Sequence, residues 1–194
     1  MTFDLMTQTH AAPFVVLSPG CSGANRVAAA LHGMGVSMGT GFLWTDPANP
    51  GSYEDQRLRD LDAAALAGNI SCREWVFRLL DYCDDRGAAG TQWGMSDPRL
   101  CDLAGWLRRA LPHGRYIRVV RPVEEAIAEC EAVYGVGAGP KVARNLILRR
   151  EATLDEHFSD AELVIGYRQA LEPTLLFPRL LDFVKARSYR LVTN

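Results

Sequence analysis

The sequence predicts an α/β fold, a three-layer sandwich in which a mostly parallel sheet carries helices on both faces. Short apolar segments rich in β-branched residues alternate with segments whose apolar residues recur at helical spacing. In addition, the first apolar segment runs directly into a glycine-bearing loop and then a helix. This order opens many nucleotide-binding α/β folds.

The expected elements follow one another along the chain. Residues 13–18 form a continuous apolar run, which is typical of a strand buried on both faces. Residues 40–52 are rich in Gly, Pro and Asn and are expected to be a loop. Helices are expected over 26–34, 53–66 (with acidic residues in its first turn), 71–82, 99–111, 124–134, 141–158 and 175–186, the fifth and sixth separated by the glycine-rich segment 135–139. Further strands are expected over 91–95, 116–120, 162–165 and 189–193.

Composition narrows the class of protein. A chain of 194 residues that is 48% hydrophobic suits a single domain, expected over 13–194 after a tail at 1–12. With 21 Lys and Arg against 23 Asp and Glu, the net charge of −2 gives no overall attraction to nucleic acid or anionic membranes. No apolar stretch is long enough to span a bilayer, and no secretory signal is expected.

Cysteine and histidine usage indicates a cytoplasmic protein without a metal centre. The five cysteines are widely spaced, with no C-x-x-C pair, and are expected to be reduced thiols. The four histidines are scattered along the chain. We therefore expect no metal ligands.

The strongest chemical signal is the loop 18–25. A glycine-bearing turn between a strand and a helix aims backbone N–H groups at one point and, with the helix dipole, forms an anion site. The loop lacks the lysine and the magnesium-binding hydroxyl of a Walker A motif, which disfavours an ATPase or GTPase. It also differs from the C-x5-R loop of cysteine phosphatases, because only four residues separate Cys21 from Arg26. Cys21, close to a helix N-terminus, is expected to have a lowered pKa. The alternative is that Gly20 and Gly23 only make a tight turn.

Several segments, in chain order, resemble the sulfotransferase family in its bacterial and phage branch. The resemblance runs from about residue 13 to 185 and rests on the segments 21–25, 31–39, 49–55, 93–100, 119–123 and 163–173. In that family they correspond to an R-S-G-T-S type loop, L-G-V-x-M/L-G, N-P-x-G-Y-x-E-D, W-G-x-K-D-P-R-L, a strand entering R-P, and v-x-Y-x-x-L-x-x-P.

The resemblance implies a P-loop nucleotide hydrolase-like fold of the sulfotransferase type. It implies sulfuryl transfer from 3′-phosphoadenosine 5′-phosphosulfate to a hydroxyl or amine of a small-molecule, glycan or lipid acceptor, with no metal. The first loop would hold the phosphosulfate, and Arg121 with residue 129 would hold the 3′-phosphate. The residues assigned to the cofactor site are Gly20, Cys21, Ser22, Gly23, Ala24, Asn25, Arg121 and Glu129. Glu54 is assigned as the general base and Arg26 as a displaced cation.

The chain departs from the family pattern at charged and hydroxyl positions. Cys21, Ala24, Asn25, Ser96 and Glu129 stand where the family has a basic residue, two hydroxyl residues, a lysine and a serine. A charge-assisted contact is worth about 1.5–3 kcal/mol, so these losses lower the expected cofactor affinity. A second hypothesis is therefore a binding module that has lost its donor site. A weaker third is a nucleotide or nucleoside kinase-like protein.

Structural roles compete with the functional ones at several positions. Arg121 alternatively pairs with Glu124 or Glu125, Glu54 belongs to a first helical turn, and Asp97 is an N-cap. Trp44 and Trp93 line an acceptor pocket or belong to the core. The basic residues Lys141, Arg144, Arg149 and Arg150 are expected on a solvated helix face, and the alternative is a flap that closes over an anionic cofactor.

Overall fold

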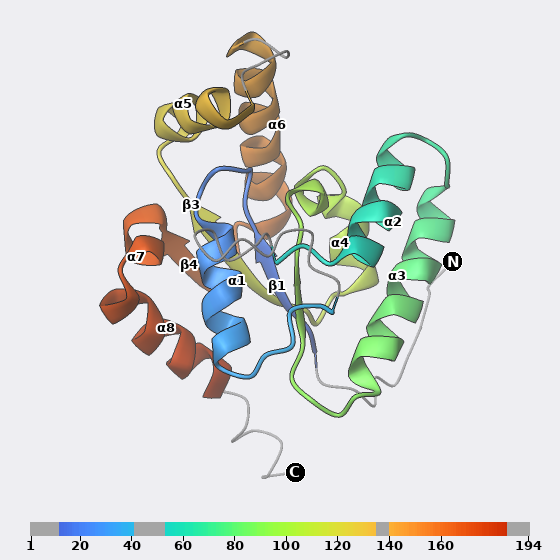
Figure 1. Ribbon diagram of the computed structural model, residues 1–194. Coiled ribbons are helices and arrows are strands. Elements are labelled where there is room, and N and C mark those ends of the chain that lie inside the picture. The colour runs from blue at the N-terminus through green and yellow to red at the C-terminus, as the bar shows by residue number, and fades with distance from the viewer. Residues whose placement is uncertain (1–11, 41–52, 135–139, 186–194) are drawn as a thin grey trace.

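A four-stranded parallel sheet forms the centre of the computed structural model, which describes residues 12–40, 53–134 and 140–185 (Figure 1). The strand order is β2-β1-β3-β4, and each neighbouring pair is parallel. The strands are β1 (Phe14–Leu17), β2 (Gly94–Ser96), β3 (Arg115–Val120) and β4 (Leu163–Gly166). The expected α/β class with a parallel sheet is confirmed.

Helices cover both faces of this sheet because successive strand residues point to opposite sides. Val15 and Leu17 belong to one core and Phe14 and Val16 to the other. The first core is closed by α2 (Gln56–Leu66), α3 (Cys72–Gly87), α4 (Ala104–Ala110) and the end of α6 (Pro140–Phe158). The second core is closed by α1 (Ala24–Gly33), α7 (Tyr167–Leu171) and α8 (Pro173–Lys185). Helix α5 (Val123–Tyr134) packs on α6, above the carboxyl end of the sheet (Figure 1).

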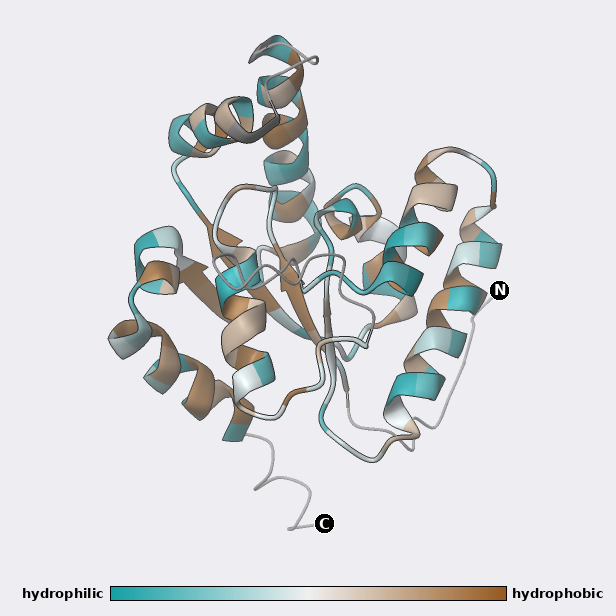
Figure 2. Ribbon diagram, in the orientation of Figure 1, coloured by the Kyte–Doolittle hydropathy of each residue, from teal (hydrophilic) through white to brown (hydrophobic). Residues whose placement is uncertain are grey.

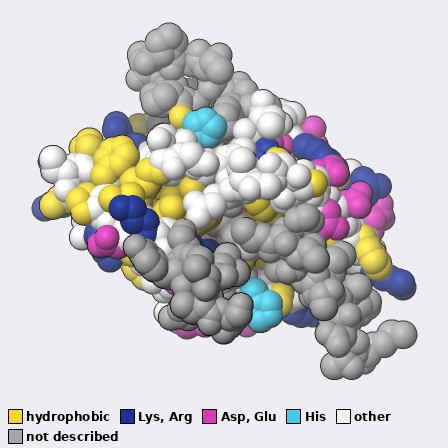
Figure 3. Space-filling view, turned by 90° about the horizontal axis from the view of Figure 1, so that it is seen from below, with side chains coloured by type: hydrophobic (Ala, Val, Ile, Leu, Met, Phe, Trp, Pro, Cys, Tyr) yellow, Lys and Arg dark blue, Asp and Glu magenta, His cyan; other side chains and the backbone are white. Residues whose placement is uncertain are grey.

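The surface pattern agrees with this layering. Apolar residues gather on the strands and on the inner helix faces, and polar residues on most outer faces, except on α8, which also carries exposed apolar residues (Figure 2). Basic and acidic side chains are interspersed on the face seen from below (Figure 3). None of the helices in the described ranges is long and apolar enough to cross a membrane.

Some element boundaries differ from the expected ones for identifiable reasons. Helix α2 begins at Gln56 because Asp55 is its N-cap, accepting from the Arg57 amide at 3.0 Å. Glu54 and Asp55 therefore precede the helix, and the expected acidic first turn is wrong. The helix expected at 99–111 is two pieces, a 3₁₀ turn η1 (Pro98–Cys101) and α4. Helix α7 was not expected, and α3 continues to Gly87. The expected N-terminal tail (1–11), most of the expected loop with Trp44 (41–52), the glycine-rich segment (135–139) and the expected last strand (189–193) lie outside the described residues.

Candidate functional site

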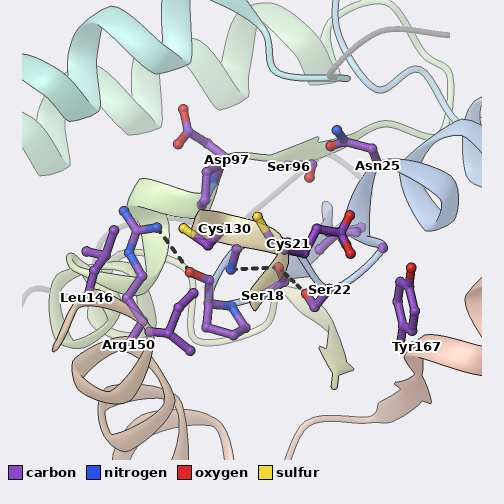
Figure 4. Close-up of a pocket in the computed structure, with 18 of the residues that line it drawn as sticks. Ser18, Cys21, Ser22, Asn25, Ser96, Asp97, Cys130, Leu146, Arg150 and Tyr167 are labelled. Carbon is purple, nitrogen blue, oxygen red and sulfur yellow. Dashed lines mark hydrogen bonds between the residues drawn. The ribbon is translucent and has the colours of Figure 1, made fainter. Parts of the chain in front are cut away.

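A cavity of about 600 Å³ opens at the carboxyl end of the sheet. The crossover after β1 leads to β2, and the crossover after β3 leads to β4 on the opposite side. The crevice between the carboxyl ends of β1 and β3 is therefore the topological switch point, where open α/β sheets bind ligands. The cavity is lined by the loop 18–25, the segment after β2, and residues of α5, α6 and α7 (Figure 4).

The loop 18–25 is shaped by one serine and by three residues with positive φ. The Ser18 hydroxyl accepts from the Ser22 hydroxyl at 2.6 Å and from the Gly20 amide at 3.2 Å. Gly20 and Gly23 have φ of 118° and 87°, and Cys21 has φ of 49°. Since a side chain at positive φ is disfavoured, the two glycines explain how the chain turns so tightly before α1.

This loop presents a row of unused hydrogen-bond donors. The five successive backbone N–H groups from Cys21 to Asn25 have no acceptor in the described part of the chain. The N-terminus of α1 has no side-chain cap and no acidic residue in its first turn. Free amides together with the positive end of the helix dipole attract an anion. The loop that contains Gly20, Ser22, Gly23, Ala24 and Asn25 therefore leaves these backbone donors available to a ligand.

Cys21 does not have the expected lowered pKa. Burial, together with the neighbouring Cys130 and Glu129 side chains, raises the pKa of its thiol to about 12. The partial positive charge of a helix N-terminus is outweighed by the loss of water around the sulfur. The prediction of an activated thiol is wrong.

Arg121 is surrounded by protein groups and does not line the cavity. Its guanidinium donates to the Cys21 carbonyl at 2.7 Å, forms a short ion pair with Glu129 and lies 3.6 Å from Glu125. It also stacks on Tyr167, 3.7 Å from the ring centre. We call Arg121, Glu125, Glu129 and Tyr167 the Arg121 cluster. The sequence predicted that Arg121 either binds a phosphate or pairs with a carboxylate. In the structure, it pairs with carboxylates.

Three arginines line the cavity in the described part of the chain, and they differ in their partners. Arg99 donates to both oxygens of Asp97, at 2.8 and 2.7 Å, and lies 3.7 Å from Glu54. Arg150 donates to Asp102 at 2.7 and 2.9 Å. Arg26 is exposed at the start of α1, with no ion-pair partner among the described residues. Arg26 is therefore the cavity arginine whose charge is free to meet a ligand.

Glu54 lines the cavity, on the segment that precedes α2. Its side chain is 15% exposed, and burial, followed by the neighbouring Asp97, raises its carboxyl pKa. A raised pKa makes a carboxylate a better proton acceptor near neutral pH. Asp97 is an N-cap, as one alternative predicted, and its side chain is fully buried.

Sequence reasoning missed several residues of the cavity and misplaced one. Arg150 was expected on a solvated face, but it is buried and donates to the Pro19 carbonyl at 3.1 Å. Its spacing of four and eight residues from Leu146 and Val142, which also line the cavity, was the available signal. Cys130 was not singled out, and nothing in its local sequence marks it, whereas Tyr167 stands at the tyrosine of the v-x-Y-x-x-L-x-x-P segment but was given no role. Trp93 is a core residue, 2% exposed.

No group of His, Cys, Asp or Glu side chains within the described ranges is arranged to hold a metal ion. Comparison of the chain with protein-family models and with curated proteins gives no match. The argument for function therefore depends on the site itself.

Proposed function

We propose that this protein binds a sulfonucleotide in the cavity at the carboxyl end of the sheet and transfers its sulfuryl group to a hydroxyl or amine. The observation that carries the proposal is the row of backbone N–H groups from Cys21 to Asn25, which lacks acceptors in the described chain and faces a cavity. Backbone donors of this kind bind phosphate and sulfate oxygens without needing a lysine.

The chemistry needs a charge stabiliser and a proton acceptor. In the transfer, the acceptor oxygen or nitrogen attacks sulfur, and the bond between sulfur and the phosphate oxygen breaks. The leaving adenosine 3′,5′-bisphosphate gains negative charge, which the loop amides, the α1 dipole and Arg26 would stabilise. The proton of the acceptor would pass to Glu54, which lines the same cavity.

The Arg121 cluster favours a second candidate, a binding module without transferase activity. A ligand with a 3′-phosphate would compete with Glu129 for the Arg121 guanidinium. If the 3′-phosphate cannot displace Glu129, the loop binds one phosphate group of a different ligand. The cavity then recognises this ligand without transferring a group from it.

Calorimetry with adenosine 3′,5′-bisphosphate, ADP and AMP distinguishes these functions. Saturable binding of the bisphosphate with Kd in the range of about 1–100 μM, tighter than AMP, supports the transferase. AMP binding as tightly as the bisphosphate supports the binding module. A folded protein that binds none of the three contradicts both proposals, since both need the loop to hold a phosphate.

A further inference from the structure

Two thiols share the floor of the cavity. Cys21 belongs to the loop and Cys130 to α5, and both line the cavity. The Cys130 side chain lies close enough to the Cys21 thiol to raise the pKa of that thiol, and both sulfur atoms are visible in the close-up (Figure 4). The other three cysteines of the chain do not line it: Cys72 begins α3, Cys83 is in the core, and Cys101 donates to the Ser18 carbonyl at 3.0 Å.

The Arg121 cluster explains why these two residues meet. Arg121 donates to the carbonyl of Cys21 and pairs with Glu129, the residue directly before Cys130. One guanidinium thus ties the loop to α5 at adjacent positions. Among the described residues other than glycine, Cys21 has the only positive φ, a conformation that costs about 1–2 kcal/mol. The contacts around it therefore hold its backbone, and with it the direction of the thiol.

We propose that Cys21 and Cys130 form a reversible oxidation site, in which a disulfide joins the anion-binding loop to α5. With hydrogen peroxide as oxidant, the Cys130 thiol is oxidised to a sulfenic acid and one water is released. The Cys21 sulfur then attacks the Cys130 sulfur, the sulfur–oxygen bond breaks, and the hydroxyl leaves with the Cys21 proton as a second water. Two thiols and one peroxide thereby give one disulfide and two waters.

The environment of the pair determines which sulfur reacts first and how the oxidant arrives. Burial and the Cys130 neighbour raise the pKa of Cys21 to about 12, so Cys21 keeps its proton at neutral pH and its own oxidation by peroxide is slow, which leaves the first step to Cys130. Because both residues line the open cavity, a molecule as small as peroxide reaches them without unfolding. Cys83 and Cys101 are buried and do not line the cavity, so they serve as internal references.

The disulfide would change ligand binding, a consequence that depends on the proposed function of the loop. Cys21 provides the first of the five free amides, so a bond from its side chain to α5 limits the movement of that amide toward a phosphate. The site would therefore bind anions in its reduced form and lose affinity on oxidation. A thiol reductant would reverse the change.

Mass spectrometry of the full-length folded protein tests the chemistry. Trypsin places Cys21 in the peptide 1–26 and Cys130 in the peptide 119–141, each with a single cysteine. After peroxide treatment we expect these two peptides linked, with a mass lower by two hydrogen atoms than their sum, and separated again by dithiothreitol. Cys130→Ser should prevent the link, whereas Cys72→Ser, outside the cavity, should not. Failure to find the link in protein that stays folded overturns the proposal, as does a link that forms equally with Cys72, Cys83 or Cys101.

Calorimetry with adenosine 3′,5′-bisphosphate tests the consequence on the same samples. We expect oxidised protein to bind at least about tenfold more weakly than reduced protein, with recovery after reduction. Cys130→Ser should show the same affinity before and after peroxide. A disulfide that leaves the affinity unchanged overturns the regulatory role. If reduced protein does not bind, the proposed function fails, while the linked peptide still decides whether the oxidation site exists.

Discussion

The loop 18–25 and the Arg121 cluster are in contact, but among the described residues the loop has unpaired polar groups whereas the cluster has paired ones. The loop leaves the amides from Cys21 to Asn25 without acceptors in the described chain, whereas Arg121 has two carboxylates, a carbonyl and an aromatic ring around it. In the first region the backbone is ready for a ligand. In the second, carboxylates of the protein pair with the Arg121 guanidinium, which a ligand would otherwise bind. The binding capacity of this cavity therefore depends mainly on backbone geometry.

The largest effect is expected from Gly23→Ala, which alters the loop itself. The new Cβ would lie 3.2 Å from Tyr167 Cδ2 and 3.3 Å from the Ala170 Cβ, at φ of 87°. The loop or α7 must then shift, and losing two charge-assisted hydrogen bonds at about 1.5 kcal/mol each weakens binding of adenosine 3′,5′-bisphosphate about 100-fold. Calorimetry measures this loss.

Gly35→Ala is the matched control for this variant. Gly35 follows the other end of α1, has a similar φ of 90°, and has no atom within 4 Å of the new Cβ. Both variants should lose about 1–2 kcal/mol of stability in urea unfolding, but only Gly23→Ala should lose ligand. Equal binding losses in the two variants would contradict the role of the loop.

Glu129→Gln should free the Arg121 guanidinium from its nearest carboxylate, so that it can bind a ligand as the loop amides can. Without the Glu129 charge, Arg121 keeps only the more distant Glu125 carboxylate at 3.6 Å and is available to a second phosphate. We expect adenosine 3′,5′-bisphosphate to bind about tenfold more tightly while AMP changes little, since one phosphate contact is worth about 1.5 kcal/mol.

Glu124→Gln provides the comparison, because Glu124 pairs with Arg144 on the exposed surface, at 2.9 Å. It should not alter the affinity for either nucleotide. If Glu129→Gln also has no effect, Arg121 has a structural role in joining the loop to α5, and the cavity does not reach a second phosphate.

Arg26→Ala distinguishes the contribution of the Arg26 charge to ligand binding from that of the backbone N–H groups of the loop 18–25. Because Arg26 is exposed, its contribution is screened, and we expect a loss of about fivefold in affinity at low salt that shrinks at high salt. Arg73→Ala, on the exposed surface of α3, should have no effect. A loss independent of salt would mean that Arg26 supports the loop through packing.

The sequence was sufficient to predict the elements whose signal is local. β1, β3 and β4 lie within about a residue of their expected positions, because each contains consecutive apolar residues. The five-residue helix α7 is too short to show a period, and was missed. The loop also has a local signature.

Long-range contacts explain what could not be predicted in the site. Arg150 donates to Asp102, which lies 48 positions earlier in the chain. Cys21 neighbours Cys130, which lies more than 100 positions later. Helical spacing places a residue on a face but does not say which side chain covers that face. For the same reason the spacing from Arg121 to Glu129 gave no sign that the two would pair with each other.

The smallest predicted effect is on the pH dependence of stability and concerns Asp62. This residue lies on α2, close to the Asp97 carboxylate beside the cavity. It is fully buried, and one oxygen accepts from Trp75 Nε1 at 2.8 Å while the other has no partner among the described residues. Burial, followed by the Asp97 charge, raises its pKa well above the ordinary value. The folded state therefore holds this proton more tightly than the unfolded chain, so its contribution to stability is complete in acid and is lost as the pH rises through the folded pKa.

Asp62→Asn should remove this part of the pH dependence, because the amide cannot ionise and its oxygen still accepts from Trp75. We expect the variant to be no more stable than the wild type at pH 5 and more stable by about 1 kcal/mol at pH 8, measured by urea unfolding. Asp81→Asn, on α3, serves as the exposed control and should leave the pH dependence unchanged. If the stabilities of the wild type and of Asp62→Asn change by the same amount from pH 5 to pH 8, Asp62 is ionised in the fold throughout this range. The unpartnered oxygen would then need a donor.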